Sequence, residues 1–435
     1  MSSPKACFIR LDEIWAKEIG KENTVSGHVL SALHNSRRID AFAWARQAVE
    51  AGVRIFDAVH VMEGSLPHFA HADAASILRF FAVGSEAEKG AIFGGMLYPK
   101  FERWLPGHPE VAREIKRLHE TQPENHSYAL YGAALHALIH HDFQSGFDLA
   151  IEATRSPEPL VAGSALNVLG LVDYTHPDCY RAIDETLQVC TTIVGNPEHP
   201  LLGTAAGTAS RLIGLRESEV AALLEKAART RKSEALYAIS VFLFRERKDY
   251  WDRPWFWPLM MLLAVVEPTH NGTLHNIDHL MYGWLKDPAR VPKVLEFLNA
   301  WIAAQSEDVM QKTGFVKGFD STVHRLAEVP SALGTALTTW LLNPEKRYPL
   351  VAHQVIAKLR VARFTNLAFD PDILDALSED ELRFLVRRIL GYLFGHDVLL
   401  PLVFSLLKTK DAKERNGCAP DLAAWAMAWC TLRLV

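Results

Sequence analysis

Apolar residues recur at helical spacing along this chain, and that spacing restricts the fold more than any other feature. One set, at positions i, i+3, i+4, i+7 and i+8, consists of Val294, Phe297, Leu298, Trp301 and Ile302. A second set with the same spacing consists of Val220, Leu223, Leu224, Ala227 and Ala228. The alternation of apolar and polar residues that marks a β-strand is scarce. The sequence therefore predicts an all-α protein.

Helix starts are marked by side chains that can accept hydrogen bonds from free backbone amides. In four places such a residue precedes a proline, whose fixed φ suits the first helical turn: Ser156, Asp287, Asn343 and Asp370. Three further pairs have the spacing of a capping box: Thr121 with Glu124, Thr175 with Asp178, and Ser378 with Glu381. These signals divide the sequence into many short helices.

The middle of the chain is predicted to form helices in pairs. The predicted ranges are 124–140, 143–155, 157–174, 176–193, 197–213, 216–230, 232–248, 254–266, 273–286 and 289–304. The first members of successive pairs begin about 33 to 41 residues apart, which is typical of helical hairpins that stack as a solenoid. We therefore expect stacked antiparallel helix pairs.

Between Glu124 and Gln305 the chain resembles the HEAT-like α-solenoids. Segments that carry the resemblance are SPEPLVAGSALNVLGLVDYTHPDCYRAIDETLQV and DPARVPKVLEFLNAWIAA. The resemblance implies a fold but no particular partner or activity. An irregular multi-helix bundle is the alternative, because the spacing varies by several residues. The expected division is an N-terminal helical region over 1–122, helical repeats over 123–305 and a C-terminal helical region over 306–435.

Charge and cysteine content restrict the function classes. The formal net charge is −5 over 435 residues, which is not the basic balance of a typical nucleic-acid-binding protein. The five cysteines include no C-x-x-C pair, so they predict neither a disulfide framework nor a zinc site. Glycine-rich phosphate loops and serine nucleophile elbows are absent from the sequence. We expect no cofactor and no enzymatic activity.

Two apolar stretches are candidates for membrane spans. Residues 254–266 are too few to span a bilayer and are predicted to form a core helix. Residues 389–407 carry His396 and Asp397 at their centre, which favours two buried helices joined by a turn. The first residues contain no apolar segment of a secretory signal. A cytoplasmic protein without a membrane partner is expected.

His275, Asp278 and His279 form the sharpest candidate for metal chemistry. Histidines at i and i+4 face the same way on a helix and are a workable pair of zinc ligands. No third ligand is indicated, so a solvated or hydrogen-bonded helix face is the favoured interpretation. His136 with His140, and His68 with His71, are weaker pairs; a helix start with Asp73 in its first turn accounts for the latter.

A basic segment rich in aromatic residues is the candidate binding site. It includes Arg245, Arg247, Lys248, Trp251 and Arg253. Trp and Arg dominate protein-binding hot spots, and Arg beside aromatic rings also suits single-stranded nucleic acid. A structural connector between two helices is the third interpretation. The function predicted is a non-enzymatic scaffold or adaptor that binds another protein, with nucleic-acid binding or base processing, and a metal-dependent hydrolase, as alternatives.

Overall fold

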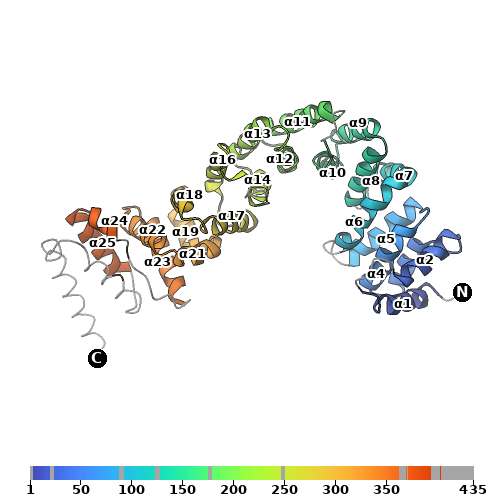
Figure 1. Ribbon diagram of the computed structural model, residues 1–435, viewed down its shortest axis with the longest axis horizontal. Helices are drawn as coiled ribbons and strands as arrows, with labels where there is room; N and C mark the ends of the chain where they lie inside the picture. Colours follow the sequence, from blue (N-terminus) through green and yellow to red (C-terminus); the bar gives the residue numbers. More distant parts are fainter. Residues whose placement is uncertain are drawn as a thin grey trace. The chain divides into compact units, whose positions relative to one another are not determined.

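A computed structural model describes residues 3–19, 24–87, 93–122, 128–174, 179–245, 250–361, 369, 371–392 and 402 of the chain. Throughout these residues the secondary structure consists of helices and turns, without a β-strand, and the all-α prediction is confirmed (Figure 1). The chain divides into two compact units, Met1–Leu223 and Leu224–Val435. The predicted three-part division with boundaries near 122 and 305 stays a prediction.

The first unit is built from short helices joined by tight turns. They are α1 (Pro4–Trp15), α2 (Val25–Asn35), α3 (Ala41–Glu50), α4 (Ile55–Ser65), η1 (Leu66–His68), α5 (Ala74–Ala87), α6 (Phe93–Trp104), η2 (Leu105–Gly107), α7 (Pro109–Thr121), α8 (Tyr128–His141), α9 (Phe143–Ala153), α10 (Pro159–Leu169), α11 (Tyr180–Val194) and α12 (Leu202–Arg211). Helix α13 (Glu217–Arg229) contains the boundary between the units.

The second unit continues in the same manner. Its helices are α14 (Ser233–Arg245), α16 (Phe256–Leu262), η5 (Leu263–Val265), α17 (Asn271–Trp284), η6 (Pro288–Arg290), α18 (Val291–Ala304), α19 (Glu307–Thr313), α20 (Phe315–Gly318), α21 (Asp320–Ala327), α22 (Pro330–Leu342), α23 (Arg347–Val361), α24 (Pro371–Ala376) and α25 (Glu379–Tyr392).

Helices two places apart in the sequence stack on one another. In the first unit α1, α3, α5 and α7 form one row of contacts, while α2, α4, α6, α8, α10 and α12 form another. In the second unit α14 packs on α17 and α17 packs on α21. Consecutive helices such as α8 and α9, which a single residue connects, also contact each other. Each helix therefore buries its apolar side against near neighbours in the sequence.

Hydrogen bonds between side chains and distant partners follow the same rule. Side-chain hydrogen bonds between helices join positions such as Arg216 and Asp184, 32 residues apart, and Tyr348 and Asn299, 49 residues apart. Thr208 donates to the Leu166 carbonyl in the first unit, and Trp301 donates to the Val266 carbonyl in the second. These hydrogen bonds join helices that are near one another in the sequence, up to the separation of α18 and α23.

Both apolar sets predicted from helical spacing lie in the core. Val294, Phe297, Leu298, Trp301 and Ile302 are all fully buried along α18. The set on α13 is buried as well. Helix α8 differs, because it is apolar on nearly all sides and contacts α6, α7, α9 and α10. A helix surrounded in this way is expected to be apolar all round.

The helix-start predictions succeed in part. Ser378 and Glu381 form the predicted reciprocal capping box: the Glu381 carboxylate accepts from the Ser378 amide at 2.9 Å, and the Ser378 hydroxyl accepts from the Glu381 amide at 3.3 Å. Asp287 caps the first turn of η6 through the Ala289 amide. The prediction at Ser156 is two residues early, because Glu158 takes the N-cap of α10.

Two other predicted starts are wrong in detail. Asn343 caps a turn through the Glu345 amide, and α23 begins later, at Arg347. Thr121 is the last residue of α7 instead of a helix start. Pro371 begins α24 as predicted. The capping pair of Thr175 and Asp178, the predicted turn around His396 and the final apolar helix lie outside the described residues.

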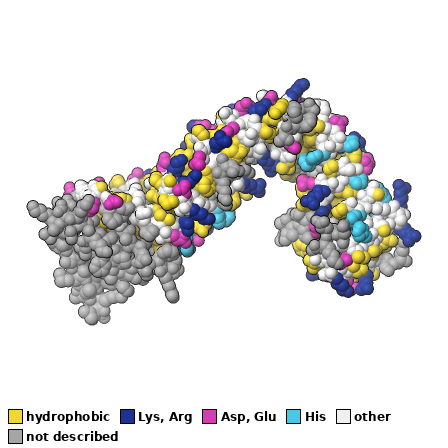
Figure 2. Space-filling view, in the orientation of Figure 1, with side chains coloured by type: hydrophobic (Ala, Val, Ile, Leu, Met, Phe, Trp, Pro, Cys, Tyr) yellow, Lys and Arg dark blue, Asp and Glu magenta, His cyan; other side chains and the backbone are white. Residues whose placement is uncertain are grey.

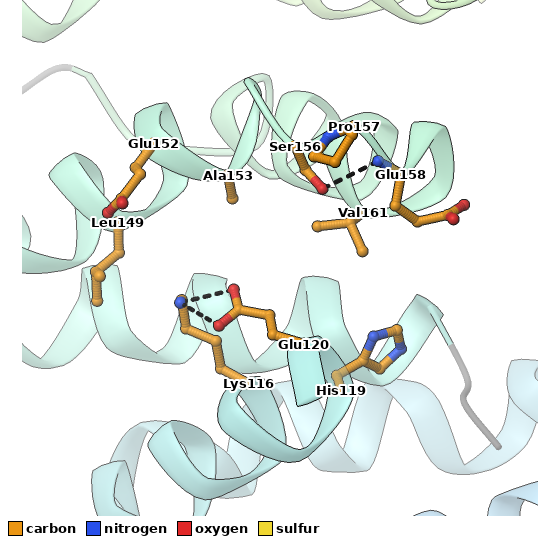
Figure 3. A pocket seen from close by; sticks show the side chains of 10 residues that line it. All are labelled: Lys116, His119, Glu120, Leu149, Glu152, Ala153, Ser156, Pro157, Glu158 and Val161. Atoms are coloured by element: carbon orange, nitrogen blue, oxygen red, sulfur yellow. Dashed lines mark hydrogen bonds and ion pairs between the residues drawn. The ribbon is translucent and has the colours of Figure 1, made fainter. Parts of the chain in front are cut away.

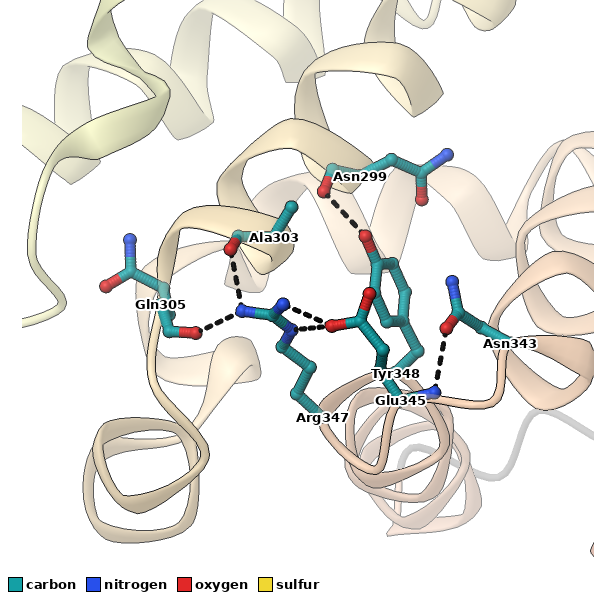
Figure 4. Close-up of polar contacts among 7 residues, drawn as sticks. All are labelled: Asn299, Ala303, Gln305, Asn343, Glu345, Arg347 and Tyr348. Carbon is teal, nitrogen blue, oxygen red and sulfur yellow. Dashed lines mark hydrogen bonds and ion pairs between the residues drawn. The ribbon is translucent and has the colours of Figure 1, made fainter.

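Arg347 joins two distant helices of the second unit (Figure 4). Its guanidinium donates to the carbonyl oxygens of Ala303 at 2.6 Å and Gln305 at 2.8 Å, and it also pairs with Glu345. These carbonyls belong to the end of α18, where backbone acceptors lack helical partners and positive charge is favourable. The Tyr348 hydroxyl donates to the Asn299 carbonyl of the same helix. The N-terminus of α23 is thereby fixed on the C-terminal end of α18.

Residues 254–266, predicted as a core helix, form α16 and η5 with their apolar side chains largely buried. Within the described part of the chain no helix combines the length and hydropathy required to cross a bilayer.

Candidate interaction surface

The predicted basic and aromatic segment lies between α14 and α16 in the second unit. Arg245 is the exposed last residue of α14, Trp251 is partly buried and Arg253 is exposed. Arg247 and Lys248 lie outside the described residues. The structure therefore places three of the five predicted binding residues.

Arg290, which no sequence pattern singles out, covers the ring of Trp251. The guanidinium carbon lies 4.5 Å from the centroid of the Trp251 ring. Arg290 also contacts Asp252 at 3.1 Å and Asp287 at 3.2 Å. A guanidinium over an indole face gains a cation–π attraction, so Trp251 already has a cationic partner within its own chain. Arg290 lies 38 residues after Asp252 in the sequence, and local sequence patterns do not reveal a contact over that separation.

The other tryptophans of this segment pack against one another. The Trp284 ring centroid lies 5.5 Å from Trp257, 5.6 Å from Phe256 and 5.8 Å from Trp251. Trp284 and Phe256 are buried. These spacings suit the tilted and edge-to-face pairs that stabilise a core. Phe256 therefore belongs to the interior of the second unit, while Trp255 and Trp257 are partly buried.

A different set of rings gathers on neighbouring faces of α14 and α17. Tyr237 is 51% exposed, and its ring lies against Gly272, where a Cβ would come within 3.1 Å of Cε2. The remaining members are exposed or partly exposed: Phe244, His275, His279 and Tyr282. We call these five residues the α14–α17 face. Histidines reach the surface in both units, and Figure 2 shows them among hydrophobic and basic side chains.

Ring contacts join three members of the α14–α17 face, and two cations lie beside a fourth. The ring of His279 lies 4.3 Å from that of His275 and 6.2 Å from that of Phe244, measured between centroids. Lys286 and Arg325 place their cationic groups 5.8 and 5.9 Å from the centroid of the Tyr282 ring. Helices α14 and α17 therefore present aromatic rings and imidazoles together, with cations from Lys286, after α17, and Arg325, on α21, beside Tyr282.

Asp278, the carboxylate of the predicted metal candidate, has a structural partner. Asp278 is buried, and its two oxygens accept hydrogen bonds from the backbone amides of Ser321 at 3.0 Å and Thr322 at 2.8 Å. It thereby caps the first turn of α21. His275 and His279 do lie side by side as predicted. Among the described residues no group of three or more His, Cys, Asp or Glu is placed to hold a metal ion, and the metal hypothesis stays a prediction.

We compared the sequence with models of known protein families, and none matches. A comparison with curated proteins gave no match either.

Proposed function

We propose that this protein is a HEAT-like helical-repeat protein that binds another protein through the α14–α17 face. Its support is that most helices of each unit pack on helices near them in the sequence. Such packing buries one side of most helices and leaves the other side available, which is how solenoid proteins obtain extended binding surfaces. The alternatives of a nucleic-acid-binding protein and a metal-dependent hydrolase have no comparable support in the side-chain arrangement.

The observation that carries the proposal is the grouping of partly exposed rings on α14 and α17. Isolated apolar side chains at a surface are ordinary and need no explanation. Tyr237, Phe244 and Tyr282 instead share one surface with two flanking cations. Tyr and Arg are enriched in the residues that contribute most to binding between proteins, because they combine a large contact area with polar groups.

Site-specific photocrosslinking in the cells that naturally make the protein tests the proposal. p-Benzoylphenylalanine replaces Tyr237 or Tyr282, each of which is already aromatic, so the substitution alters the surface little. The matched control places the same group at Glu296, an exposed residue of α18 in the same unit. We expect the same discrete adduct at both tyrosines and none at Glu296.

Quantitative binding of the purified adduct partner completes the test. We expect Tyr237→Ser to weaken its binding by at least about tenfold, as removal of a hot-spot tyrosine does, while Glu296→Gln leaves it unchanged. Adducts that form equally at Glu296, or a partner whose affinity is insensitive to Tyr237→Ser, would show that the α14–α17 face is not the binding surface.

A further inference from the structure

The first unit contains a pocket of about 420 Å³ between α7, the end of α9 and the turn that leads into α10 (Figure 3). Lys116 pairs with Glu120 at 2.7 Å, and the Glu158 carboxylate accepts from the Leu160 amide of its own helix at 3.4 Å. The carboxylates of Glu152 and Glu158 lie at opposite ends of the pocket. The lining side chains therefore converge on no common point, and we assign this pocket no ligand.

The start of α17, in the second unit, carries a chemically reactive pair of residues. Asn271 and Gly272 are the first two residues of this helix and form an Asn–Gly sequence. Asparagine is one of the thermolabile residues of proteins. When glycine follows it, no Cβ obstructs the approach of the glycine nitrogen to the asparagine side-chain carbon. The attack requires a free asparagine side chain, a free glycine amide and a backbone that can leave the helical conformation.

Both reacting groups are free in the structure. Asn271 is exposed, and its side chain makes no hydrogen bond to the described residues. Gly272 is exposed as well. The first helical hydrogen bond into α17 is donated by the Leu274 amide, to the His270 carbonyl at 3.1 Å, and the Gly272 amide precedes it. Amides at the start of a helix have no intrahelical acceptor. The Gly272 nitrogen is therefore not held by an acceptor.

The backbone at this point can open at little cost. A helical backbone keeps the Gly272 nitrogen away from the side-chain carbon of Asn271, so the first turn of α17 must open before the two atoms meet. Terminal turns fray most readily. The N-cap residue His270 makes no side-chain hydrogen bond to this turn, and glycine disfavours a helix. Opening confined to one turn therefore brings the reacting atoms together.

Asn35 and Ser36, at the end of α2, show the opposite arrangement. The Asn35 side chain donates to the His68 carbonyl at 2.8 Å and accepts from the Ala70 amide at 2.9 Å. The Ser36 amide donates to the Ala32 carbonyl at 3.1 Å. The asparagine side chain and the amide that follows it are thus both held. The chain therefore offers its own matched control for the reactivity of asparagine.

We propose that Asn271 and Gly272 form a site of covalent self-modification, and that its isoaspartate product loosens the packing of α17 on α14. The Gly272 nitrogen forms a bond to Cγ of Asn271, the bond from Cγ to Nδ2 breaks, and ammonia leaves with the amide proton. One water molecule then opens the cyclic succinimide, which gives either aspartate or isoaspartate. The reaction requires no oxidant and no reductant.

The isoaspartate product lengthens the main chain beside the ring of Tyr237. Its backbone passes through the former side chain, which adds one methylene group directly before Gly272. A Cβ at Gly272 would already come within 3.1 Å of Cε2 of Tyr237, so little room exists for a displaced backbone. The modification occurs within the chain and requires no partner. It can therefore fail while the proposed protein binding stands, and the reverse is also possible.

Peptide mapping of the intact protein, incubated at mildly alkaline pH with and without concentrated urea, tests the modification. Electron-transfer dissociation distinguishes isoaspartate from aspartate. For each site, dividing the rate in the folded protein by the rate in urea removes the intrinsic difference between Asn–Gly and Asn–Ser. We expect folding to slow the reaction at Asn271 by less than about tenfold, and at Asn35 by more than about a hundredfold.

Two variants separate the effects of charge and backbone length. Asn271→Gln should abolish the product, because its longer side chain forms the cyclic intermediate far more slowly. Freshly purified Asn271→Asp carries the new negative charge on a normal backbone. Hydrogen exchange in peptides that cover 233–245 and 271–284 should be faster in the isoaspartate protein than in wild type, and unchanged in Asn271→Asp.

Two results would overturn the proposal. The first is equal slowing of the reaction at Asn271 and Asn35 by folding, which would mean that the start of α17 is as firmly held as the end of α2. The second is isoaspartate protein that exchanges like Asn271→Asp, which would mean that the longer backbone leaves the packing of α14 on α17 unchanged. Circular dichroism verifies that both variants are folded.

Discussion

Single side chains hold distant helices of this protein in place, and Asp278 does so most directly. Its buried carboxylate accepts from two amides of α21, while the Thr322 hydroxyl donates back to the Asp278 carbonyl at 3.1 Å. Three hydrogen bonds thus join α17 to the start of α21. Removing the carboxylate would leave two buried amides without an acceptor and out of contact with water. The free energy lost is therefore larger than the net contribution of the hydrogen bonds.

Asp278→Ala is therefore expected to lower the free energy of opening of α21 by about 2 to 3 kcal/mol. Asp278→Asn keeps one acceptor oxygen and should cost about half as much. Hydrogen-exchange mass spectrometry of peptides that cover 320–327 measures the opening. His275→Ala, one turn earlier on α17 and exposed, is the control, with a change below about 0.5 kcal/mol. Equal effects of Asp278→Ala and His275→Ala would contradict the capping role.

Histidines of the first unit make its stability depend on pH. Burial lowers the pKa of His68, with a further decrease from His28, and burial lowers the pKa of His71, with a further decrease from His34. The folded state therefore takes up these protons less readily than the unfolded state does. The contribution of the two uncharged rings to the free energy of unfolding is fully present above the unfolded pKa of about 6.5 and decreases as the pH falls below it.

Hydrogen exchange in residues 66–73, corrected for intrinsic rates, should accordingly increase between pH 7.5 and pH 5.5. The double variant His68→Gln, His71→Gln should show a smaller increase, because it removes both titrating rings. The carboxylates with lowered pKa values, Glu114 and Glu381, lose their contributions only at lower pH. The same increase in the double variant would show that other groups cause the pH dependence.

At the scale of elements, close helix crossings depend on glycine. Helix α9 crosses α8 at Gly146, where a Cβ would lie 2.3 Å from the Ile139 nitrogen and 2.5 Å from its Cα. These are backbone atoms, which cannot move aside without displacing a helix. Within α8, a Cβ at Gly132 would meet only side-chain atoms, at 3.6 Å or more. A side chain at position 146 would therefore collide with the backbone of α8, whereas a methyl group at position 132 would fit.

Gly146→Ala is expected to destabilise the first unit by at least about 2 kcal/mol through overpacking. Gly132→Ala should be neutral or stabilising by up to about 1 kcal/mol, because alanine favours a helix interior. Urea denaturation followed by circular dichroism measures both changes. A Gly146→Ala variant as stable as Gly132→Ala would mean that α8 and α9 separate at little cost.

At the scale of the whole molecule, stability is expected to be local. Long-range hydrogen bonds such as those of Thr208, Trp301 and Arg347 join positions 35 to 44 residues apart. Proteins with such nearest-neighbour contacts open in segments instead of all at once. A change in one unit should therefore leave distant helices of the other unit unaffected.

Gly146→Ala tests this locality. We expect faster hydrogen exchange in α7 to α10 and unchanged exchange in α17 to α23. Wild-type protein measured in parallel supplies the reference rates for every peptide. Uniformly faster exchange across both units would indicate one cooperative structure and contradict the nearest-neighbour description.

Much of the fold could be predicted from spacing alone, because burial of one helix side imposes a period near 3.6 residues. That rule placed the α18 and α13 cores correctly. The same spacing rule could not predict which residues form the candidate binding surface. Trp251 stands out in the sequence, but Arg290, which covers its ring, does not. Tyr237 and Tyr282 belong to one surface only because α14 packs on α17.

The sequence by itself determined the helices, their approximate limits and the capping box of Ser378 and Glu381, since these depend on residues within a few positions of each other. Tertiary structure alone decided that Asp278 caps α21 and that Glu152 and Glu158 line one pocket. Those arrangements join separate helices, and the geometry of helix packing, which no local pattern encodes, determines which side chains meet.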